Sequence, residues 1–144
     1  MILPDVNVLL AVFHPDAAGR DTCSPWFENL QASGEPFAVS TNHLASVVRL
    51  ATNPKVLTNP AALHQVIDFC AAILTDPCCR HIEPGPHHFA HFASLCIASK
   101  ARGNLVTDAW IAALALEHGC TIITFDKDFR KFPGLKVSAP LIGG

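Results

Sequence analysis

Short apolar segments of strand length alternate along this chain with longer segments that have helical periodicity. The clearest strand is Thr121 to Phe125, a run of β-branched and aromatic residues, and a shorter one, Ile2 to Pro4, opens the chain. Between them, apolar residues recur at three- and four-residue spacing in several segments. Alternating strands and helices predict an α/β fold, a three-layer sandwich in which a short parallel sheet is flanked by helices.

The remaining elements are expected from the same periodicity and from capping and helix-ending residues. Strands are expected at 37–40, 80–83 and 136–138, and helices at 7–13, 21–32, 61–74, 86–101 and 108–118. A further helix carries Leu44 and Val47 on one face, with Thr41 or Asn42 as its cap. Pro60 is expected at the start of the next helix, and a continuous apolar face is expected along 63–74.

The composition limits the class of protein. A chain of 144 residues suits one domain, which we predict to span residues 1–144. Charged residues make up 15% of the chain, below the usual fraction of about 25%, which suggests that a partner covers part of the surface. The formal net charge of −2 gives no general attraction to nucleic acid or membrane, so binding to either requires local patches.

The six cysteines favour free thiols over a disulfide framework. They lie mostly in apolar helical segments, and the N-terminus lacks the basic region, apolar core and cleavage site of a signal peptide. No uninterrupted apolar run reaches the roughly 20 residues that span a bilayer. We therefore expect a cytoplasmic protein without a membrane segment.

Four aspartates stand where an apolar run ends or a helix begins: Asp5, Asp108, Asp126 and Asp128. In an open parallel sheet, ligands bind outside the carboxyl ends of the strands, where Asp5 and Asp126 both fall. Carboxylates beside apolar segments are costly unless a positive or hydrogen-bonding group meets them, and a hard cation such as Mg²⁺ is one such partner. The pattern predicts a metal site built from the two ends of the chain.

Each of these residues also has a structural interpretation. Asp108 taken alone is typical of a helix cap, and Asp128 of a turn. Asn7 either orients Asp5 or closes a turn, and Thr124 either supports a carboxylate or only belongs to its strand. The combination indicates chemistry more strongly than any single member does.

Three motifs, in this order, resemble those of the PIN-domain ribonucleases and, within them, the VapC-type toxins of toxin–antitoxin systems. They are Leu3-Pro4-Asp5-Val6-Asn7, Asn104-Leu105-Val106-Thr107-Asp108-Ala109 and Thr124-Phe125-Asp126-Lys127-Asp128-Phe129. Segments 48–54 and 132–135 match that group as well, so the resemblance covers nearly the whole chain.

This resemblance implies a Mg²⁺- or Mn²⁺-dependent endoribonuclease, the toxin of a type II pair, that forms a homodimer and is inhibited by a cognate VapB-type antitoxin. Asp5 and Asp108 match the principal metal ligands, Asp126 the C-terminal acidic position and Asp128 a frequent companion. All four are expected to be catalytic, with Asp5, Asp108 and Asp126 holding the metal. The helices between residues 21 and 74 are expected to contact the antitoxin and the second subunit.

One position departs from the family pattern. PIN domains commonly carry a glutamate a few residues before the arginine that matches Arg49, and Ser46 stands there in this chain. A serine supplies no charge, although its hydroxyl can hold a metal-bound water. Ser46 therefore joins Asn7 and Thr124 as an expected supporting residue, and the metal stoichiometry depends on it.

Basic residues flank the acids in the sequence. They are Lys100, Arg102, Lys127, Arg130 and Lys131. We expect them to contact RNA phosphates, and the alternative is a solvated basic edge. Histidines 87, 88 and 91 include an i, i+4 pair, but no cysteine pair accompanies it to complete a zinc site.

Two other functions are compatible with the same residues. A catalytically weak PIN-like module that binds RNA or a partner is favoured by Ser46. An aspartyl-nucleophile phosphohydrolase is suggested by Phe125-Asp126-Lys127-Asp128 after an apolar strand. That class normally places its Asp-x-Asp motif near the first strand, where this chain has Asn7.

Overall fold

In the described part of the chain, five short parallel strands form one sheet in the order β3-β2-β1-β4-β5. The computed structural model describes residues 1–141, so residues 142–144 of the predicted domain lie outside the described part. The strands are β1 (Ile2–Pro4), β2 (Phe37–Val39), β3 (Cys79–His81), β4 (Thr121–Ile123) and β5 (Val137–Ser138).

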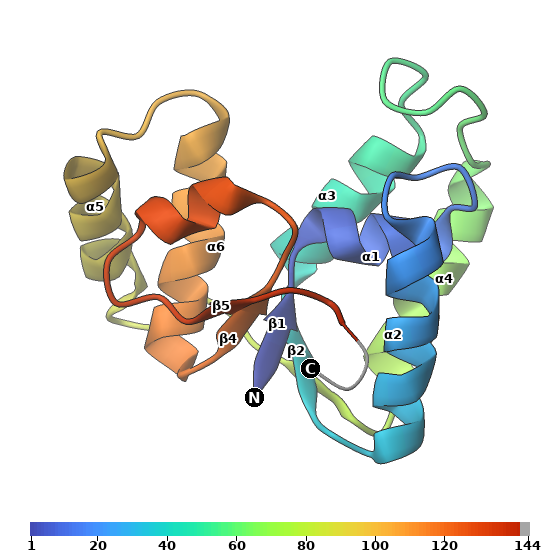
Figure 1. Ribbon diagram of the computed structural model, residues 1–144, viewed down its shortest axis with the longest axis horizontal. Coiled ribbons are helices and arrows are strands. Elements are labelled where there is room, and N and C mark those ends of the chain that lie inside the picture. The colour runs from blue at the N-terminus through green and yellow to red at the C-terminus, as the bar shows by residue number, and fades with distance from the viewer. Residues whose placement is uncertain (142–144) are drawn as a thin grey trace.

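Helices cover both faces of this sheet (Figure 1). They are α1 (Val6–Phe13), α2 (Arg20–Ser33), α3 (Thr41–Ala51), α4 (Leu63–Thr75), α5 (His88–Ser99) and α6 (Asn104–His118), with a 3-10 helix, η1 (Lys127–Lys131). Helix α1 packs on α2 and α3 on one side, whereas α5 packs on α6 on the other. The predicted three-layer α/β sandwich is confirmed.

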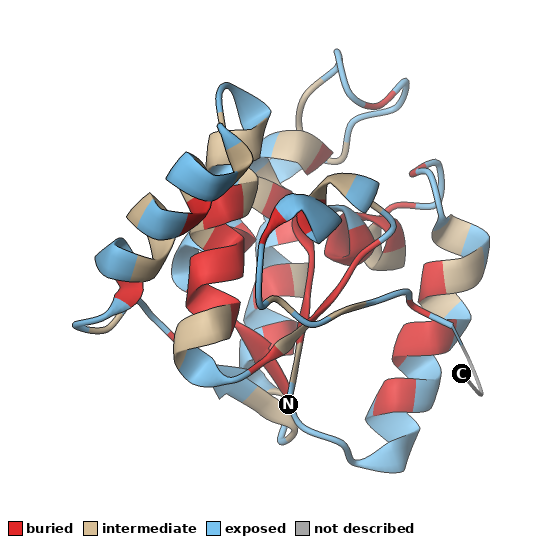
Figure 2. Ribbon diagram, turned by 60° about the vertical axis from the view of Figure 1, so that its left-hand side comes forward, coloured by how far each residue is buried: buried red, intermediate tan, exposed pale blue. Residues whose placement is uncertain are grey.

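The central strand β1 joins the two ends of the chain. Leu3 pairs with Ile122 and Pro4 with Ile123 in the parallel β1–β4 ladder, so the residues that follow these strands emerge side by side. Leu3 and Ile122 are fully buried, as expected for a sheet covered on both faces. Figure 2 shows the buried residues concentrated on these strands and on the inner faces of the helices.

Several helix starts differ from the sequence prediction. Helix α6 begins at Asn104, after Gly103 with φ 60°, so Asp108 lies in the second turn and the cap interpretation of this residue is wrong. Helix α3 is capped by Ser40, whose hydroxyl accepts a hydrogen bond from the His43 N–H at 3.1 Å, and not by Thr41 or Asn42. Strand β2 ends at Val39, one residue before its predicted end, because Ser40 caps α3.

Helix α4 also starts later than predicted, at Leu63 instead of next to Pro60. The Ala61 N–H donates to the Ala51 carbonyl at 2.8 Å, which ties the segment after Pro60 to the end of α3 before the helix can begin.

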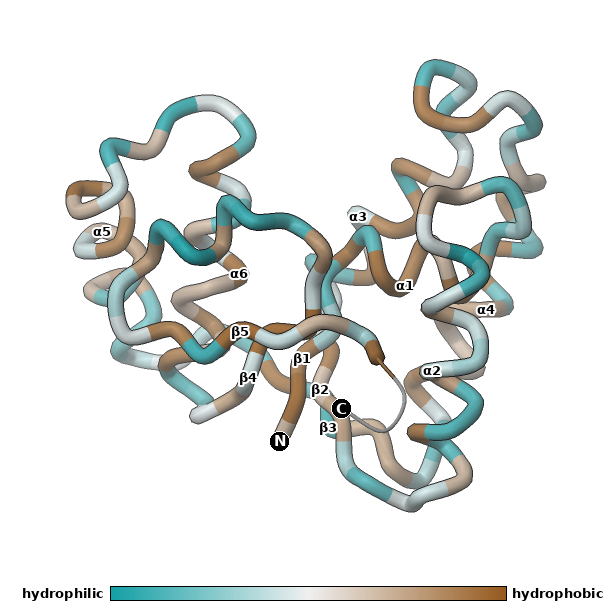
Figure 3. Tube along the Cα trace, viewed as in Figure 1, coloured by the Kyte–Doolittle hydropathy of each residue, from teal (hydrophilic) through white to brown (hydrophobic). Residues whose placement is uncertain are grey.

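The predicted apolar face of α4 is only partly buried. Val66 and Cys70 face the core, whereas Leu63, Ile67 and Leu74 are exposed. On α5, Phe89 at the start of the helix is 73% exposed. The hydropathy colouring in Figure 3 shows apolar segments on the outer helices as well as in the central strands.

All six cysteines are free thiols, and no helix among residues 1–141 is both long and apolar enough to cross a membrane.

Candidate active site

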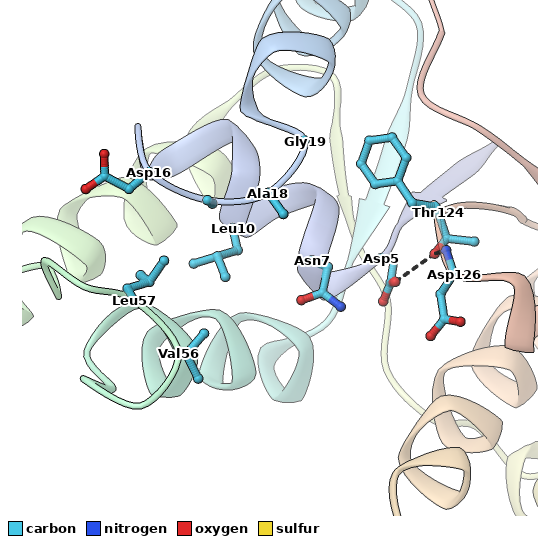
Figure 4. Close-up of a pocket in the computed structure, with 12 residues that line it drawn as sticks. Asp5, Asn7, Leu10, Asp16, Ala18, Gly19, Val56, Leu57, Thr124 and Asp126 are labelled. Atoms are coloured by element: carbon cyan, nitrogen blue, oxygen red, sulfur yellow. Dashed lines mark hydrogen bonds between the residues drawn. The ribbon is translucent and has the colours of Figure 1, made fainter.

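Asp5 follows β1 directly and caps the N-terminus of α1. Its own N–H extends the β1–β4 pairing by donating to the Ile123 carbonyl at 2.8 Å. Its Oδ1 accepts a hydrogen bond from the Val6 N–H at 2.7 Å, and its Oδ2 accepts one from the Thr124 hydroxyl at 2.8 Å (Figure 4). Asp5 is only 4% exposed, so its carboxylate is buried with a donor on each oxygen.

A chain of hydrogen bonds continues from Thr124 to the next two acids. The Thr124 Oγ1 accepts from the Asp126 N–H at 2.9 Å, and the Asp126 Oδ1 accepts from the Asp128 N–H at 2.9 Å. The buried ring of Phe129 anchors η1 immediately beyond Asp128. The turn after β4 therefore has a fixed shape, in which each side chain holds the backbone of the next acid.

Helix α6 brings Asp108 to the same place. One carboxylate oxygen from each of Asp108, Asp126 and Asp128 lies within 4.8 Å of the others. Asp5 adjoins this group, since Asp5, Asp108 and Asp126 line one cavity of about 300 Å³. Four acids from opposite halves of the sequence thus meet at the carboxyl edge of the sheet. Asp128 belongs to this group, which its interpretation as a turn residue alone does not explain.

Burial and mutual repulsion disturb the titration of two of these acids. Burial raises the pKa of Asp5 to about 6, although the hydrogen bonds from Thr124 and Val6 oppose the rise. Burial raises the pKa of Asp108 to about 7, helped by the negative charges of Asp5, Asp126 and Asp128. Within residues 1–141 neither Asp5 nor Asp108 has an ion pair with a lysine or arginine.

A hard divalent cation fits this set of residues. Its preferred ligands are carboxylate oxygens, and it would supply the positive charge that Asp5 and Asp108 lack. Among the described residues, the group of Asp108, Asp126 and Asp128 is the one with metal-binding spacing, and histidines 87, 88 and 91 are not part of it. His88, for example, has its Nε2 2.9 Å from the Trp110 carbonyl oxygen.

Helix α3 supplies the opposite wall of the acidic cavity. Ser46 and Arg49 both line it, three residues apart on one helix face. The Ser46 hydroxyl donates to the Asn42 carbonyl at 3.2 Å, and Arg49 is exposed. The cavity thus contains the position where the family commonly has a glutamate, together with one cationic side chain.

Three polar or charged lining residues were not among the predicted site residues: Arg49, Asn104 and Thr107. The helical spacing from Ser46 would have indicated Arg49, and Thr107 precedes Asp108 by one residue. Asn104 is the first residue of α6, which the sequence prediction placed outside the helix.

The five predicted RNA-binding residues lie outside the acidic cavity. Lys127, Arg130 and Lys131 are exposed on η1, and Lys131 forms an ion pair with Asp128 at 3.0 Å. Lys100 and Arg102 are exposed in the connection from α5 to α6. None of the five lines the acidic cavity. Asn7, an expected supporting residue, is exposed and does line it.

Comparison with known proteins agrees with this architecture. Residues 2–135 match the PIN domain family. This chain belongs to the PIN-domain family. It is 36% identical over 142 residues to Ribonuclease VapC25 of Mycobacterium tuberculosis, an alignment that covers 99% of this chain and 100% of the relative. It is also 36% identical to Ribonuclease VapC31 of the same species, over 97% of this chain and 99% of the relative.

Solved structures of the family have the same fold. VapBC2 from Rickettsia felis, bound to a DNA fragment from its promoter, matches with a TM-score of 0.70 and 18% identity over 96% of this chain and 98% of that one. A toxin–antitoxin complex from Klebsiella pneumoniae matches with a TM-score of 0.66 and 25% identity over 97% and 98%. The chain is therefore a PIN domain of the VapC group over its described length.

Proposed function

We propose that this protein is a Mg²⁺- or Mn²⁺-dependent endoribonuclease and the toxin of a type II toxin–antitoxin pair. The observation that carries the proposal is the convergence of four acids, of which Asp5 and Asp108 have raised pKa values and, within residues 1–141, no ion pair with a lysine or arginine. The curated relatives are named ribonucleases, which supports RNA as the substrate.

The metal ligands in this proposal are Asp5, Asp108 and Asp126, with Asp128 beside them. When bound, the cation supplies a positive charge that makes a water more acidic and offsets charge on the phosphate. The protein's part is to hold the acids in place: Thr124 orients Asp5, and the Asp128 N–H orients the Asp126 carboxylate.

The substrate phosphate needs a cationic contact, which Arg49 provides from the opposite wall of the cavity. The surrounding lysines and arginines, from Lys100 to Lys131, position the flanking phosphates without selecting a sequence. In the reaction, a water oxygen forms a new bond to phosphorus, one ester P–O bond breaks, and a proton passes to the departing oxygen.

Incubation of the purified protein with RNA in Mg²⁺, Mn²⁺ or chelator tests the activity. Cleavage is expected with either cation and not with chelator. Asp5→Asn and Asp108→Asn should abolish it, whereas Asp68→Asn, an exposed carboxylate on α4, should not. Chelator-resistant cleavage would contradict the metal dependence.

The serine at position 46 supports a second candidate, an RNA- or partner-binding module with little catalytic power. Binding of RNA without cleavage in any of these cations would favour that module. Turnover of a phosphomonoester with a trapped acyl-phosphate would instead indicate the aspartyl-nucleophile phosphohydrolase.

We further propose a VapB-type antitoxin as the partner and a homodimer as the working form in the cytoplasm. Exposed apolar side chains on α4, Leu63, Ile67 and Leu74, support a covered surface there. A basic antitoxin side chain that reaches Asp5 and Asp108 would replace the cation and inhibit cleavage. Light scattering of the protein alone and of the co-expressed pair tests both points, and a monomer in isolation would contradict the homodimer.

A further inference from the structure

A second, larger cavity adjoins the acids. It has a volume of about 690 Å³, within the range of small-molecule sites, and shares Asp5, Asn7 and Asp126 with the acidic cavity. Figure 4 shows Asp5, Thr124 and Asp126 at one end and the apolar side chains of Val56 and Leu57 toward the other. A ligand in this cavity would therefore extend directly from the acidic site.

Two loops distant in sequence form the far walls, and hydrogen bonds join them. Asp16 lies in the connection from α1 to α2, and Asn59 in the connection from α3 to α4. The Asn59 side-chain amide donates to Asp16 Oδ2 at 3.2 Å, and the Asn59 carbonyl oxygen lies 2.6 Å from Nε2 of the buried His14. These contacts hold the walls in position before any ligand arrives.

An aromatic ring lies in the wall of the cavity next to the acids. Phe125 is 45% exposed although it stands between the buried Thr124 and the half-buried Asp126. Its ring packs so closely on Gly19, which has φ 85°, that a Cβ on Gly19 would lie 2.7 Å from the ring Cε2. The absence of a side chain at Gly19 thus makes room for the Phe125 ring. The part of the ring that does not contact Gly19 is exposed to solvent.

We propose that this cavity binds an unpaired base of the RNA, stacked on Phe125, beside the phosphate that is held at the acids. The assignment rests on the proposed ribonuclease function. Aromatic faces and apolar walls bind unstacked bases, and nearby polar groups hydrogen-bond their edges. The amide of Asn7 and the carboxylate of Asp16 are polar groups of this kind among the lining residues.

The location favours a nucleotide over a segment of protein. The cavity opens onto the carboxylates where a substrate phosphate has to lie, so the sugar and base attached to that phosphate reach the cavity without crossing other parts of the surface. A base within a duplex is stacked and paired and cannot reach Phe125, so the subsite also selects unpaired RNA over double-stranded RNA.

Fluorescence anisotropy with a short, labelled, unpaired RNA tests this subsite. Ca²⁺ is the only divalent cation present, and a gel verifies that the RNA stays intact. Wild type, Phe125→Ala and Phe125→Trp are compared with Phe89→Ala, which removes an exposed ring on α5 that lines neither cavity. The same RNA is also presented as a duplex and with one abasic nucleotide at successive positions.

Loss of the Phe125 ring should weaken binding of the unpaired RNA by roughly 5- to 150-fold, the range that base–aromatic stacking produces. Phe125→Trp and Phe89→Ala should bind the unpaired RNA like wild type. In wild type, an abasic nucleotide at one position should weaken binding as much as the loss of the ring does. The same abasic RNA should bind Phe125→Ala no more weakly than the intact RNA does. Duplex RNA should bind all four proteins alike.

Equal affinity of Phe125→Ala and Phe89→Ala for unpaired RNA would overturn the subsite. So would a variant that binds RNA normally but loses the antitoxin, because the cavity would then hold protein. If wild type cuts RNA in Mn²⁺ and Phe125→Ala cuts it equally well, only the subsite fails. If wild type neither binds nor cuts RNA, the proposed function fails as well.

Discussion

The Thr124 hydroxyl donates a 2.8 Å hydrogen bond to the Asp5 carboxylate, across 119 positions of sequence. The parallel pairing of β1 with β4 places the two residues next to each other, and the same hydroxyl accepts from the Asp126 N–H. One side chain therefore holds both an acid that follows β1 and an acid that follows β4.

Thr124→Val tests this link with little change in shape. The carboxylate of buried Asp5 loses a donor, and the Asp126 N–H loses an acceptor, so the unfolding free energy should fall by about 1–3 kcal/mol. Since a hydrogen bond to the charged form lowers a pKa, its removal should raise the pKa of Asp5 further above about 6. Chemical denaturation and NMR titration of the Asp5 carboxyl measure the two effects. Thr124→Ser keeps the hydroxyl and should lose much less unfolding free energy. An equal loss in both variants would show that the hydrogen bond to Asp5 does not stabilise the fold.

The acid cluster should make the cation-free protein less stable as pH rises. The pKa values of Asp5 and Asp108 are about 6 and about 7 in the folded state, above the ordinary 3.8. The folded state therefore binds more protons than the unfolded state between about pH 4 and 7, and this contribution to stability is lost as pH increases through that window. Mn²⁺ should reverse the loss, because it binds the ionised acids and displaces their protons.

Asp108→Asn isolates this effect from other titrations. In chelator at about pH 8 the variant should be more stable than wild type by roughly 1–2 kcal/mol, less than the full pKa shift would give, because Asp108 is only half-buried. At about pH 4 the two proteins should unfold alike. Thermal unfolding at both pH values, with and without Mn²⁺, provides the measurement, and a variant less stable than wild type at the higher pH would contradict the repulsion.

Buried His43 should make the protein less stable as pH falls, which is the opposite of the effect of the acid cluster. It is buried on α3, neither ring nitrogen has a hydrogen-bond partner within the described residues, and burial lowers its pKa to about 4 despite the nearby backbone of Pro4 and Asp5. The unfolded state then binds more protons between about pH 4 and 6.5, so stability is lost as pH falls through this window. At about pH 5 the loss is about 2 kcal/mol.

His43→Leu should remove this dependence and the cost of an unpartnered polar ring. Its unfolding free energy should exceed that of wild type at about pH 5 and by a smaller margin at about pH 7.5. The matched control is His64→Leu, on the exposed face of α4, which should show neither effect. Urea denaturation at the two pH values decides, and a gain that does not depend on pH would show that His43 is not held neutral.

Much of this fold is predictable because a covered parallel sheet requires short, fully apolar strands. Leu3 and Ile122 have zero exposure, and their runs stand out in the sequence. The location of Asp5 and Asp126 at the same edge of the sheet is predictable as well, since the carboxyl ends of all strands in a parallel sheet lie at one edge. The position of Asp108 within α6 was misjudged because Gly103, at φ 60°, starts the helix earlier than the apolar periodicity does.

Features that depend on contacts between distant segments could not be predicted from the sequence. The larger cavity exists because His14 and Asp16 meet Asn59 some 45 positions away, through hydrogen bonds that no local pattern encodes. The exposure of Phe89 has the same origin. Helix α5 touches α6 but no strand is among its main contacts, so its apolar residues exceed the surface available to bury them.

Ser46 lines the acidic cavity together with Asp5, Asp108 and Asp126. Ser46→Glu adds a carboxylate to that wall and should tighten Mn²⁺ binding, since a hard cation gains an oxygen ligand with negative charge. Ser46→Ala should change the affinity little, because the hydroxyl is already bonded to the Asn42 carbonyl. Calorimetric titration of the three proteins with Mn²⁺ measures the effect.

Arg49, one turn away, is the side chain that can defeat this gain by pairing with the new glutamate. The Ser46→Glu and Arg49→Gln double variant separates the two cases. If the glutamate reaches the cation, the single and double variants should both bind Mn²⁺ more tightly than their Ser46 counterparts. If Arg49 captures it, only the double variant should. Affinity that is unchanged or weaker in both would show that position 46 contributes nothing to cation binding, whatever its place in the cavity wall.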